Sequence, residues 1–163
     1  MSPDFEALLA RLLGGGVELV LVGGYSAMLH GSSLMTRDVD IVCPMTPQNL
    51  GRLFGALEGL NPVHRMNPSA GSFTTEQAAR TDWKNLYLRT DIGVLDCLGE
   101  ILGIGNYQAC LERSTTLDLG EFTIKTLSLE ALIDAKRAMG RPRDLLTADE
   151  LEMIMARRHS SRK

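Results

Sequence analysis

The sequence lacks the features of disulfide-rich, membrane-spanning and secreted chains. Its 163 residues include three cysteines, and Cys43, Cys97 and Cys110 lie far apart without a CxxC pair. An odd number of scattered cysteines argues against a closed set of disulfides, so we expect a reducing, cytoplasmic compartment. No apolar run approaches the roughly 20 residues that a membrane-spanning helix needs, and the acidic N-terminal segment lacks a basic leader. We therefore expect no membrane partner.

Neither an excess of basic charge nor a familiar nucleotide-binding loop is present. The formal net charge is −3, so general electrostatic attraction to nucleic acid is not indicated, although a local basic patch stays open. The segment that begins at Gly23 fits neither GxxxxGK[ST] nor GxGxxG. Ser32 and Ser33 have no histidine and aspartate arranged with them as a triad, which argues against a serine hydrolase.

The apolar residues that are present predict one α/β domain. They make up 44 % of the chain, enough to bury a core at this length. With no internal repeat or interdomain linker, we expect a single α/β (α+β) domain over residues 1–163, with a central mixed sheet flanked by helices. Periodicity and end signals predict strands over 17–22, 36–43, 85–90, 92–98 and 122–127, and helices over 3–13, 24–30, 47–57 and 107–113.

The C-terminal part, about residues 128–157, is predicted to be helical. Ser128 is a suitable N-cap for one helix, which Gly140-Arg-Pro142 ends, and Thr147 and Glu150 form a capping box for a last helix. Residues 60–83 are weakly patterned, and we expect a loop region there with one short strand or helical turn.

Two aspartates interrupt a segment that otherwise has the pattern of a buried strand. Asp38 and Asp40 share one strand face, about 6.5–7 Å apart, while Val39 and Ile41 face the other side. Two such carboxylates repel each other and resist burial, and a bound divalent cation resolves both problems. The alternative is an ion pair with Arg37 or another basic residue.

A third carboxylate lies in a later apolar segment, Ile92-Gly-Val-Leu-Asp-Cys-Leu98. Alternation places Asp96 on one face with Ile92, Val94 and Leu98. If this strand neighbours the first, three carboxylates converge, and such a set can hold two metal ions about 3.5–4 Å apart. The alternative is an acid at the end of a strand, facing solvent.

Gly23 and Gly24 follow one predicted strand and begin a predicted helix. Free N–H groups, the positive end of the helix dipole and the close approach that glycine permits form an anion site suited to a triphosphate. Ser26 could add a hydroxyl to this site. A simple tight turn is the alternative interpretation.

Lys136 lies on the apolar stripe of its predicted helix, in line with Leu129, Leu132 and Ile133. Its ammonium group either reaches over the sheet to a nucleotide phosphate or extends to water while the stem packs on the core. Asp144 is a candidate partner for this lysine.

Together these residues resemble the DNA polymerase β-like nucleotidyltransferase superfamily. Its signature is an apolar residue, Gly, and Gly or Ser, then a short spacer and Asp-apolar-Asp/Glu-apolar. Here Val22-Gly-Gly24 is followed by thirteen residues and by Asp38-Val-Asp-Ile41. Asp96 matches the third acid of the family. The run GGYSAMLHGSSLMTRDVDI resembles the bacterial branch that includes abortive-infection nucleotidyltransferase toxins, and Lys136 with Arg143-Asp144 matches a later motif of that branch.

The resemblance implies a nucleotidyltransferase fold and Mg²⁺- or Mn²⁺-dependent transfer of a nucleoside monophosphate from an NTP to an acceptor hydroxyl, with release of pyrophosphate. Asp38 and Asp40 are implied to bind the ion on the β- and γ-phosphates, and with Asp96 a second ion that activates the acceptor. The residues implied to bind the triphosphate are Gly23, Gly24, Ser26 and Lys136.

The acceptor and two alternative hypotheses of function stay open at this point. The acceptor is a tRNA, a protein hydroxyl or a small molecule such as an aminoglycoside. A second hypothesis is a catalytically weak nucleotide-binding protein of the same fold, or the toxin of a toxin–antitoxin pair, with an antitoxin or a second copy as partner. A third hypothesis, an α/β domain without a site, predicts that Asp96 lies far from Asp38 and Asp40.

Overall fold

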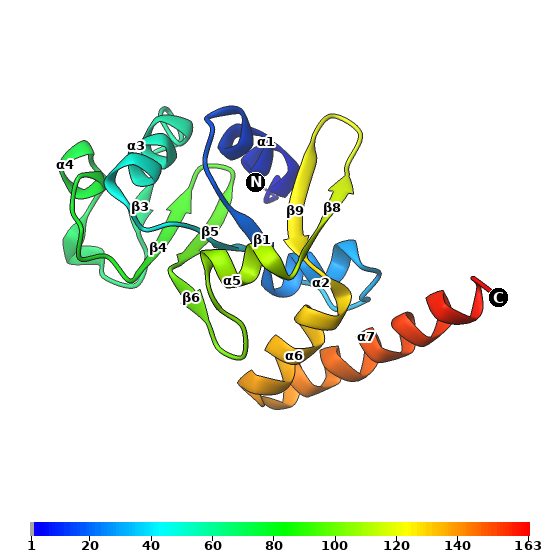
Figure 1. The fold of residues 1–163 in the computed structure, drawn as a ribbon. Coiled ribbons are helices and arrows are strands. Elements are labelled where there is room, and N and C mark those ends of the chain that lie inside the picture. The colour runs from blue at the N-terminus through cyan, green and yellow to red at the C-terminus, as the bar shows by residue number, and fades with distance from the viewer. Residues whose placement is uncertain (1) are drawn as a thin grey trace.

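The computed structural model describes residues 2–163. It contains a seven-stranded mixed sheet with helices on both faces (Figure 1). The strand order is β3-β4-β5-β2-β1-β9-β8. The β2–β5 and β1–β9 pairs are parallel and the others antiparallel. The strands are β1 (Val20–Val22), β2 (Asp38–Val42), β3 (Val63–His64), β4 (Asn85–Thr90), β5 (Gly93–Leu98), β8 (Ser114–Asp118) and β9 (Thr123–Leu127). The predicted α/β class and central mixed sheet are therefore confirmed.

The helices divide between the two faces of this sheet. In Figure 1, α1 and α3 lie above it and α5, α6 and α7 below it. The helices are α1 (Phe5–Gly14), α2 (Gly23–Leu29), α3 (Pro47–Ala56), α4 (Thr75–Ala78), α5 (Tyr107–Glu112), α6 (Leu129–Met139) and α7 (Pro142–Ser160), with a 3₁₀ turn at Pro68–Ala70. A separate small hairpin consists of β6 (Glu100–Ile101) and β7 (Gly105–Asn106).

Successive side chains of β2 point to opposite faces of the sheet and belong to two separate hydrophobic clusters. Val39 and Ile41 are buried against the α1 and α3 side, in one cluster with Leu8. Val42 belongs to the other cluster, with Leu132 of α6. Each such buried side chain contributes about 1.5–3 kcal/mol relative to exposure. The predicted faces of this strand are therefore confirmed, and Asp38 and Asp40 lie on the α6 side.

Local signals explain where several helices begin. The Thr46 hydroxyl accepts from the N–H of Asn49 at 3.2 Å, with Pro47 as the first residue of α3. The Ser128 hydroxyl accepts from the N–H of Ala131 at 3.1 Å and caps α6. These caps fix the ends of both helices and satisfy N–H groups that have no partner within the helix.

The predicted start of the last helix is wrong. α7 begins at Pro142 instead of following a capping box at Thr147. Proline at the first helical position has the required φ and lacks only an N–H that would be unpaired there. The Thr147 hydroxyl lies inside the helix and donates to the Arg143 carbonyl at 3.0 Å.

Strand β8 was not predicted, and residues 60–83 contain more structure than the one short strand or helical turn expected there. Strand β8 is a half-exposed edge strand with the mostly polar sequence Ser-Thr-Thr-Leu-Asp, and it pairs with β9. Residues 60–83 contain β3, the 3₁₀ turn and α4, which a Thr74–Gln77 capping box begins. Polar edge strands and one-turn helices carry little hydrophobic periodicity, which is why the sequence indicates loop at these places.

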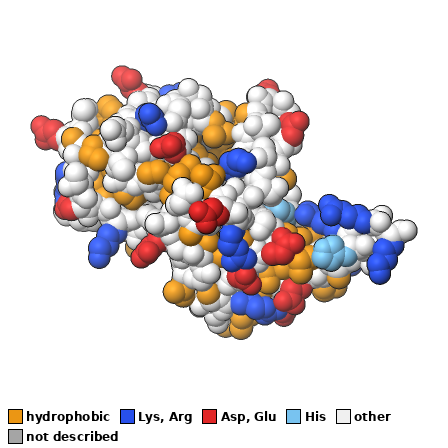
Figure 2. All heavy atoms as spheres, in the orientation of Figure 1, with side chains coloured by type: hydrophobic (Ala, Val, Ile, Leu, Met, Phe, Trp, Pro, Cys, Tyr) orange, Lys and Arg blue, Asp and Glu red, His pale blue; other side chains and the backbone are white. Residues whose placement is uncertain are grey.

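The C-terminal half of α7 projects from the rest of the molecule (Figure 1). Figure 2 shows Lys and Arg side chains gathered along this end, where the basic residues are Arg157, Arg158, Arg162 and Lys163. Within residues 2–163, no helix combines the length and the apolar character needed to span a membrane. The three cysteines are free and buried.

Candidate functional site

The parallel pairing of β2 with β5 brings the three predicted carboxylates together. In this register Asp40 lies directly opposite Asp96. Oxygen atoms of Asp38, Asp40 and Asp96 lie within 4.8 Å of one another. The expectation for a domain without a site, that Asp96 lies far from the other two, is therefore wrong. We call these three residues the carboxylate cluster.

Burial and mutual repulsion set the electrostatics of the carboxylate cluster. Asp96 is only 7 % exposed, so it is not a solvent-facing acid at the end of its strand. Burial, followed by the charges of Asp38 and Asp96, raises the pKa of Asp40 to about 7, against the opposing charges of Lys136 and Arg65. A proton or a cation is thus needed at this point, because three ionised carboxylates repel one another at short range.

Arg65 neutralises one member of the cluster. Its Nη2 donates to both carboxylate oxygens of Asp96, at 2.6 and 2.5 Å, and its Nε donates at 3.2 Å. The backbone N–H of Arg65 bonds the Tyr87 carbonyl, so the residue continues the edge strand β3 beside β4. The sequence gives no local signal for Arg65, because this contact joins positions 31 residues apart.

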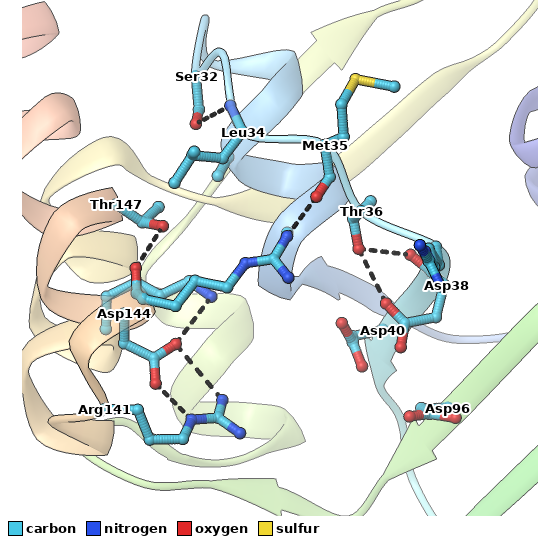
Figure 3. Close-up of a pocket in the computed structure, with 15 residues that line it drawn as sticks. Ser32, Leu34, Met35, Thr36, Asp38, Asp40, Asp96, Arg141, Asp144 and Thr147 are labelled. Carbon is cyan, nitrogen blue, oxygen red and sulfur yellow. Dashed lines mark hydrogen bonds and ion pairs between the residues drawn. The ribbon is translucent and has the colours of Figure 1, made fainter.

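Asp38 and Asp40 have no such partner. Arg37 is exposed, and among residues 2–163 no ion pair reaches either carboxylate. The Thr36 hydroxyl donates to Oδ1 of Asp38 at 2.8 Å and so orients that carboxylate (Figure 3). The alternative of an Arg37 ion pair is therefore wrong for this structure, and Thr36 is a site residue that sequence reasoning missed.

The two glycines bring the start of α2 directly against this site. A Cβ on Gly23, whose φ is +70°, would lie 2.2 Å from Oδ2 of Asp40. A Cβ on Gly24 would lie 2.8 Å from the side chain of Thr36. Only residues without a side chain fit both positions, so the glycines are required by close approach as well as by the turn.

Ser26 does not join the other predicted residues. Its side chain is fully buried, and its hydroxyl lies 2.6 Å from that of Thr126, in β9. This placement contradicts the expectation that Ser26 adds a hydroxyl for phosphate. The physical reason is that its position on α2 points into the interface with β9, away from the cavity beside the cluster.

A cavity of about 510 Å³ lies beside the carboxylate cluster, and its opposite wall is basic (Figure 3). Lys136, Arg141 and Arg143 line the cavity from α6, α7 and the turn between them, and we call them the basic wall. Arg37, Gly24 and the three residues of the carboxylate cluster also line the cavity. The predicted Lys136 is therefore at the site, while most of its side chain is buried. The cavity combines acids that can hold cations with bases that can hold anions.

Asp144 holds the basic wall in place. It is 3 % exposed and lies 3.4 Å from Lys136 Nζ and 2.5 Å from Arg141 Nε. Burial raises its pKa, but hydrogen bonding from Arg141 and the charges of Lys136 and Arg141 outweigh this and hold the pKa below its usual value. The candidate partnership of Lys136 with Asp144 is confirmed.

The loop between α2 and β2 closes one side of the cavity and is fixed to α7. Arg143 donates to the Met35 carbonyl. Glu150 accepts from the Ser32 hydroxyl and from the N–H of Ser33, both at 2.8 Å. Figure 3 shows Leu34 and Met35 on this loop above the basic wall. The loop thus adds an apolar border to a charged cavity.

The residues present could hold a metal ion. Mg²⁺ prefers oxygen ligands at about 2.1 Å, so opposite ligands of an octahedron are about 4.2 Å apart. One oxygen from each carboxylate of the cluster lies within 4.8 Å of the others, so at most small side-chain rotations are needed to reach this spacing. The raised pKa of Asp40 also indicates uncompensated negative charge. Both the geometry and the charge therefore fit a divalent cation.

Comparison with models of known protein families, and with curated proteins, gave no match for this chain. The site is therefore interpreted from its own chemistry. That chemistry consists of three converging carboxylates, a basic wall, and a glycine turn in contact with the acids.

Proposed function

We propose that this protein is a metal-dependent nucleotidyltransferase with the DNA polymerase β-like fold. It moves a nucleoside monophosphate from an NTP to an acceptor hydroxyl and releases pyrophosphate. The observation that carries the proposal is the convergence of Asp38, Asp40 and Asp96 at a cavity whose facing wall is basic. A triphosphate–metal complex needs both features in one place, because cations bind the acids and the remaining phosphate charge meets the bases.

The carboxylate cluster holds the metal and the reacting hydroxyl. Bound Mg²⁺ or Mn²⁺ neutralises phosphate charge and lowers the pKa of the acceptor hydroxyl. Asp38, which Thr36 orients, and Asp40 would hold the metal together with Asp96, and all three line the basic cavity. Asp96 accepts the hydroxyl proton, because a carboxylate has about four lone-pair sites and Arg65 donates three hydrogen bonds to it.

The basic wall and the glycine turn hold the triphosphate. Lys136 and Arg141 are supported by Asp144, so their side chains are already oriented before a nucleotide enters. Gly24 lines the basic cavity, and the missing side chains of Gly23 and Gly24 leave room for Asp40 and Thr36 beside the bound phosphates. The catalytic contribution is mainly positioning and charge neutralisation.

The test is transfer of radiolabel from α-labelled NTPs in the presence of Mg²⁺. Asp38→Ala with Asp40→Ala should lower the rate by at least about 100-fold, as loss of a main electrostatic group does. Asp134→Asn is the matched control, since Asp134 is an aspartate outside the site that pairs with Arg113. If calorimetry detects no NTP or Mg²⁺ binding to the wild-type protein, the proposal is wrong.

A competing proposal is a protein of the same fold that binds nucleotide with little transfer, as a sensor or as the toxin of a toxin–antitoxin pair. The ion pairs Arg65–Asp96 and Lys136–Asp144 favour it, because they satisfy two site charges internally. NTP binding without transfer to any acceptor would support it. Growth arrest on expression, relieved by a neighbouring gene product, would identify the toxin.

A further inference from the structure

Asp40, Lys136 and Arg141 also border a second, smaller cavity of about 140 Å³. Its remaining walls are mostly apolar and come from the sheet, from the β6–β7 hairpin and from α6, including Leu98 and Leu132. We call it the apolar slot. The basic cavity and the apolar slot therefore both border Asp40. The basic cavity suits phosphate, and the slot suits an apolar group.

The mouth of the apolar slot carries exposed hydrophobic side chains. Leu102 is 61 % exposed and Met139 44 % exposed, and both line the slot. Figure 2 shows hydrophobic side chains at the lower edge of the molecule, at the β6–β7 hairpin and at the α6–α7 junction. Large apolar side chains left uncovered beside a cavity indicate a surface that a ligand covers.

Close packing of the β6–β7 hairpin on α6 keeps the slot from narrowing. Gly103, at the tip of the hairpin, packs so closely on α6 that a Cβ there would lie 2.7 Å from Cβ of Ala138. The hairpin therefore has little freedom to move closer to the helix. A pocket that is already formed loses less free energy on ligand binding than one that must open.

The size and polarity of the slot select the ligand. An apolar cavity of about 150 Å³ in a protein core is known to bind one benzene ring. The slot has about this volume, and the Asp40 carboxylate and the Lys136 side chain form the polar part of its lining together with Arg141. We propose, resting on the function proposed above, that the slot binds the acceptor and that the acceptor is a phenol, either a small molecule or a tyrosine side chain.

This assignment fits the connectivity of the reaction. The phenol oxygen bonds to the α-phosphorus, the bond from that phosphorus to the β-bridging oxygen breaks, and pyrophosphate leaves toward the basic cavity. The phenol proton passes to a carboxylate of the cluster. In a phenol the ring is bonded to the attacking oxygen, so a ring in the slot places that oxygen beside Asp40. A nucleobase is separated from its α-phosphate by a ribose, and a purine has two rings.

Polar acceptors fit the slot poorly. The rings of aminoglycosides and of ribose carry several hydroxyl or amino groups, which would lose their hydrogen bonds to water among leucine and methionine side chains. A serine hydroxyl fits the polar part of the lining but leaves the apolar walls uncovered. Among the acceptors that the sequence leaves open, the structure thus disfavours the ribose hydroxyl of a tRNA and the aminoglycosides.

The experiment measures label transfer from α-labelled NTP to 4-methylphenol, N-acetyltyrosine amide and N-acetylserine amide. Both phenols should be labelled and the serine compound should not, and the better phenol identifies the source. Leu102→Asp places a charge at the mouth, and Ala135→Phe fills the slot. Each should raise the KM for the phenol about tenfold or more, the size of effect that pocket changes produce. Leu146→Asp, at a 64 % exposed leucine outside the slot, should leave it unchanged.

NTP binding by calorimetry separates this inference from the proposed function. For both slot variants, the NTP affinity in Mg²⁺ should stay within about twofold of wild type. Weaker NTP binding in both variants would assign the slot to the nucleobase and overturn the inference alone. Equal labelling of serine and phenol compounds would also overturn it. Failure of the wild type to bind NTP at all would instead overturn the proposed function.

Discussion

Protonation of Asp40 should control how tightly the carboxylate cluster binds a divalent cation. Its pKa is raised to about 7 by burial and by the charges of Asp38 and Asp96. Mg²⁺ binds the ionised carboxylate, so a proton on Asp40 competes directly with the metal. Metal affinity should therefore rise with pH through neutrality, where ordinary exposed aspartates are already fully ionised.

The size of the effect follows from the pKa. At pH 8 about 90 % of Asp40 is ionised and at pH 6 about 9 %, so the Mg²⁺ dissociation constant should be about tenfold larger at pH 6. About 0.9 proton should be released per ion bound at pH 6 and about 0.1 at pH 8. A cluster whose aspartates have ordinary pKa values would show neither the change in dissociation constant nor the change in proton release.

Calorimetry in buffers with different ionisation enthalpies measures both quantities. Mg²⁺ binding at pH 6 and pH 8 gives the dissociation constants, and the buffer dependence of the heat gives the protons released. Asp134→Asn serves as control, because that aspartate is outside the cluster and pairs with Arg113. Asp40→Asn should bind Mg²⁺ weakly at both pH values and release no proton.

The same pKa predicts the stability of the metal-free protein. The folded pKa of Asp40 lies above the value of 3.8 expected when unfolded, so stability should fall as the pH rises from about 4 to about 7. The upper limit of this loss is about 4 kcal/mol, at about 1.4 kcal/mol per pKa unit. In EDTA at pH 8, Asp40→Asn should therefore melt above wild type, with the difference shrinking near pH 4. A Mg²⁺ affinity that changes less than twofold between pH 6 and pH 8 would refute this reasoning.

Four further substitutions test other contacts of the site. Arg65→Leu leaves the buried Asp96 without its partner, so thermal melting in EDTA should show a loss of about 3 kcal/mol that Mg²⁺ partly restores. Gly23→Ala should abolish Mg²⁺ binding in calorimetry, because its Cβ meets Asp40 at 2.2 Å, whereas Gly51→Ala, with open space around it, should bind normally. Ser26→Ala should lower stability in urea by about 1 kcal/mol and leave the KM for NTP unchanged, since its hydroxyl bonds Thr126. Lys136→Met should raise the KM for NTP in the transfer assay by about tenfold or more, and an unchanged KM would remove that lysine from the phosphate site.

The carboxylate cluster could be predicted from the sequence because strand periodicity is a strong signal. Acids at alternate positions of an apolar strand share a face. A third acid in a second apolar strand joins them if the two strands are neighbours. The parallel register of Asp40 with Asp96 supplies this. The glycine turn was equally visible, since two glycines at the end of a strand are a local signal.

The contacts that the sequence did not reveal depend on distant parts of the chain. Arg65 reaches Asp96 only because the extension of β3 pairs with β4, and no pattern around position 65 indicates this. Ser26 looked like a phosphate ligand because it follows the glycines, but the position of β9 decides which way its side chain faces. Tertiary placement, and not propensity, determines both outcomes.

Arg65 and the two glycines together explain how a cluster of acids is tolerated before any metal binds. The glycines let the start of α2 pack against Asp40 and Thr36, which buries Asp40 and raises its pKa. Arg65 offsets part of this repulsion through its ion pair with Asp96 and its own positive charge. An incoming divalent cation thus displaces the proton of Asp40 and weakens the Arg65–Asp96 ion pair. Before it binds, the cluster does not carry three uncompensated negative charges. Metal affinity and metal-free stability should therefore change in opposite directions in Arg65→Leu, which loses stability in EDTA and gains Mg²⁺ affinity.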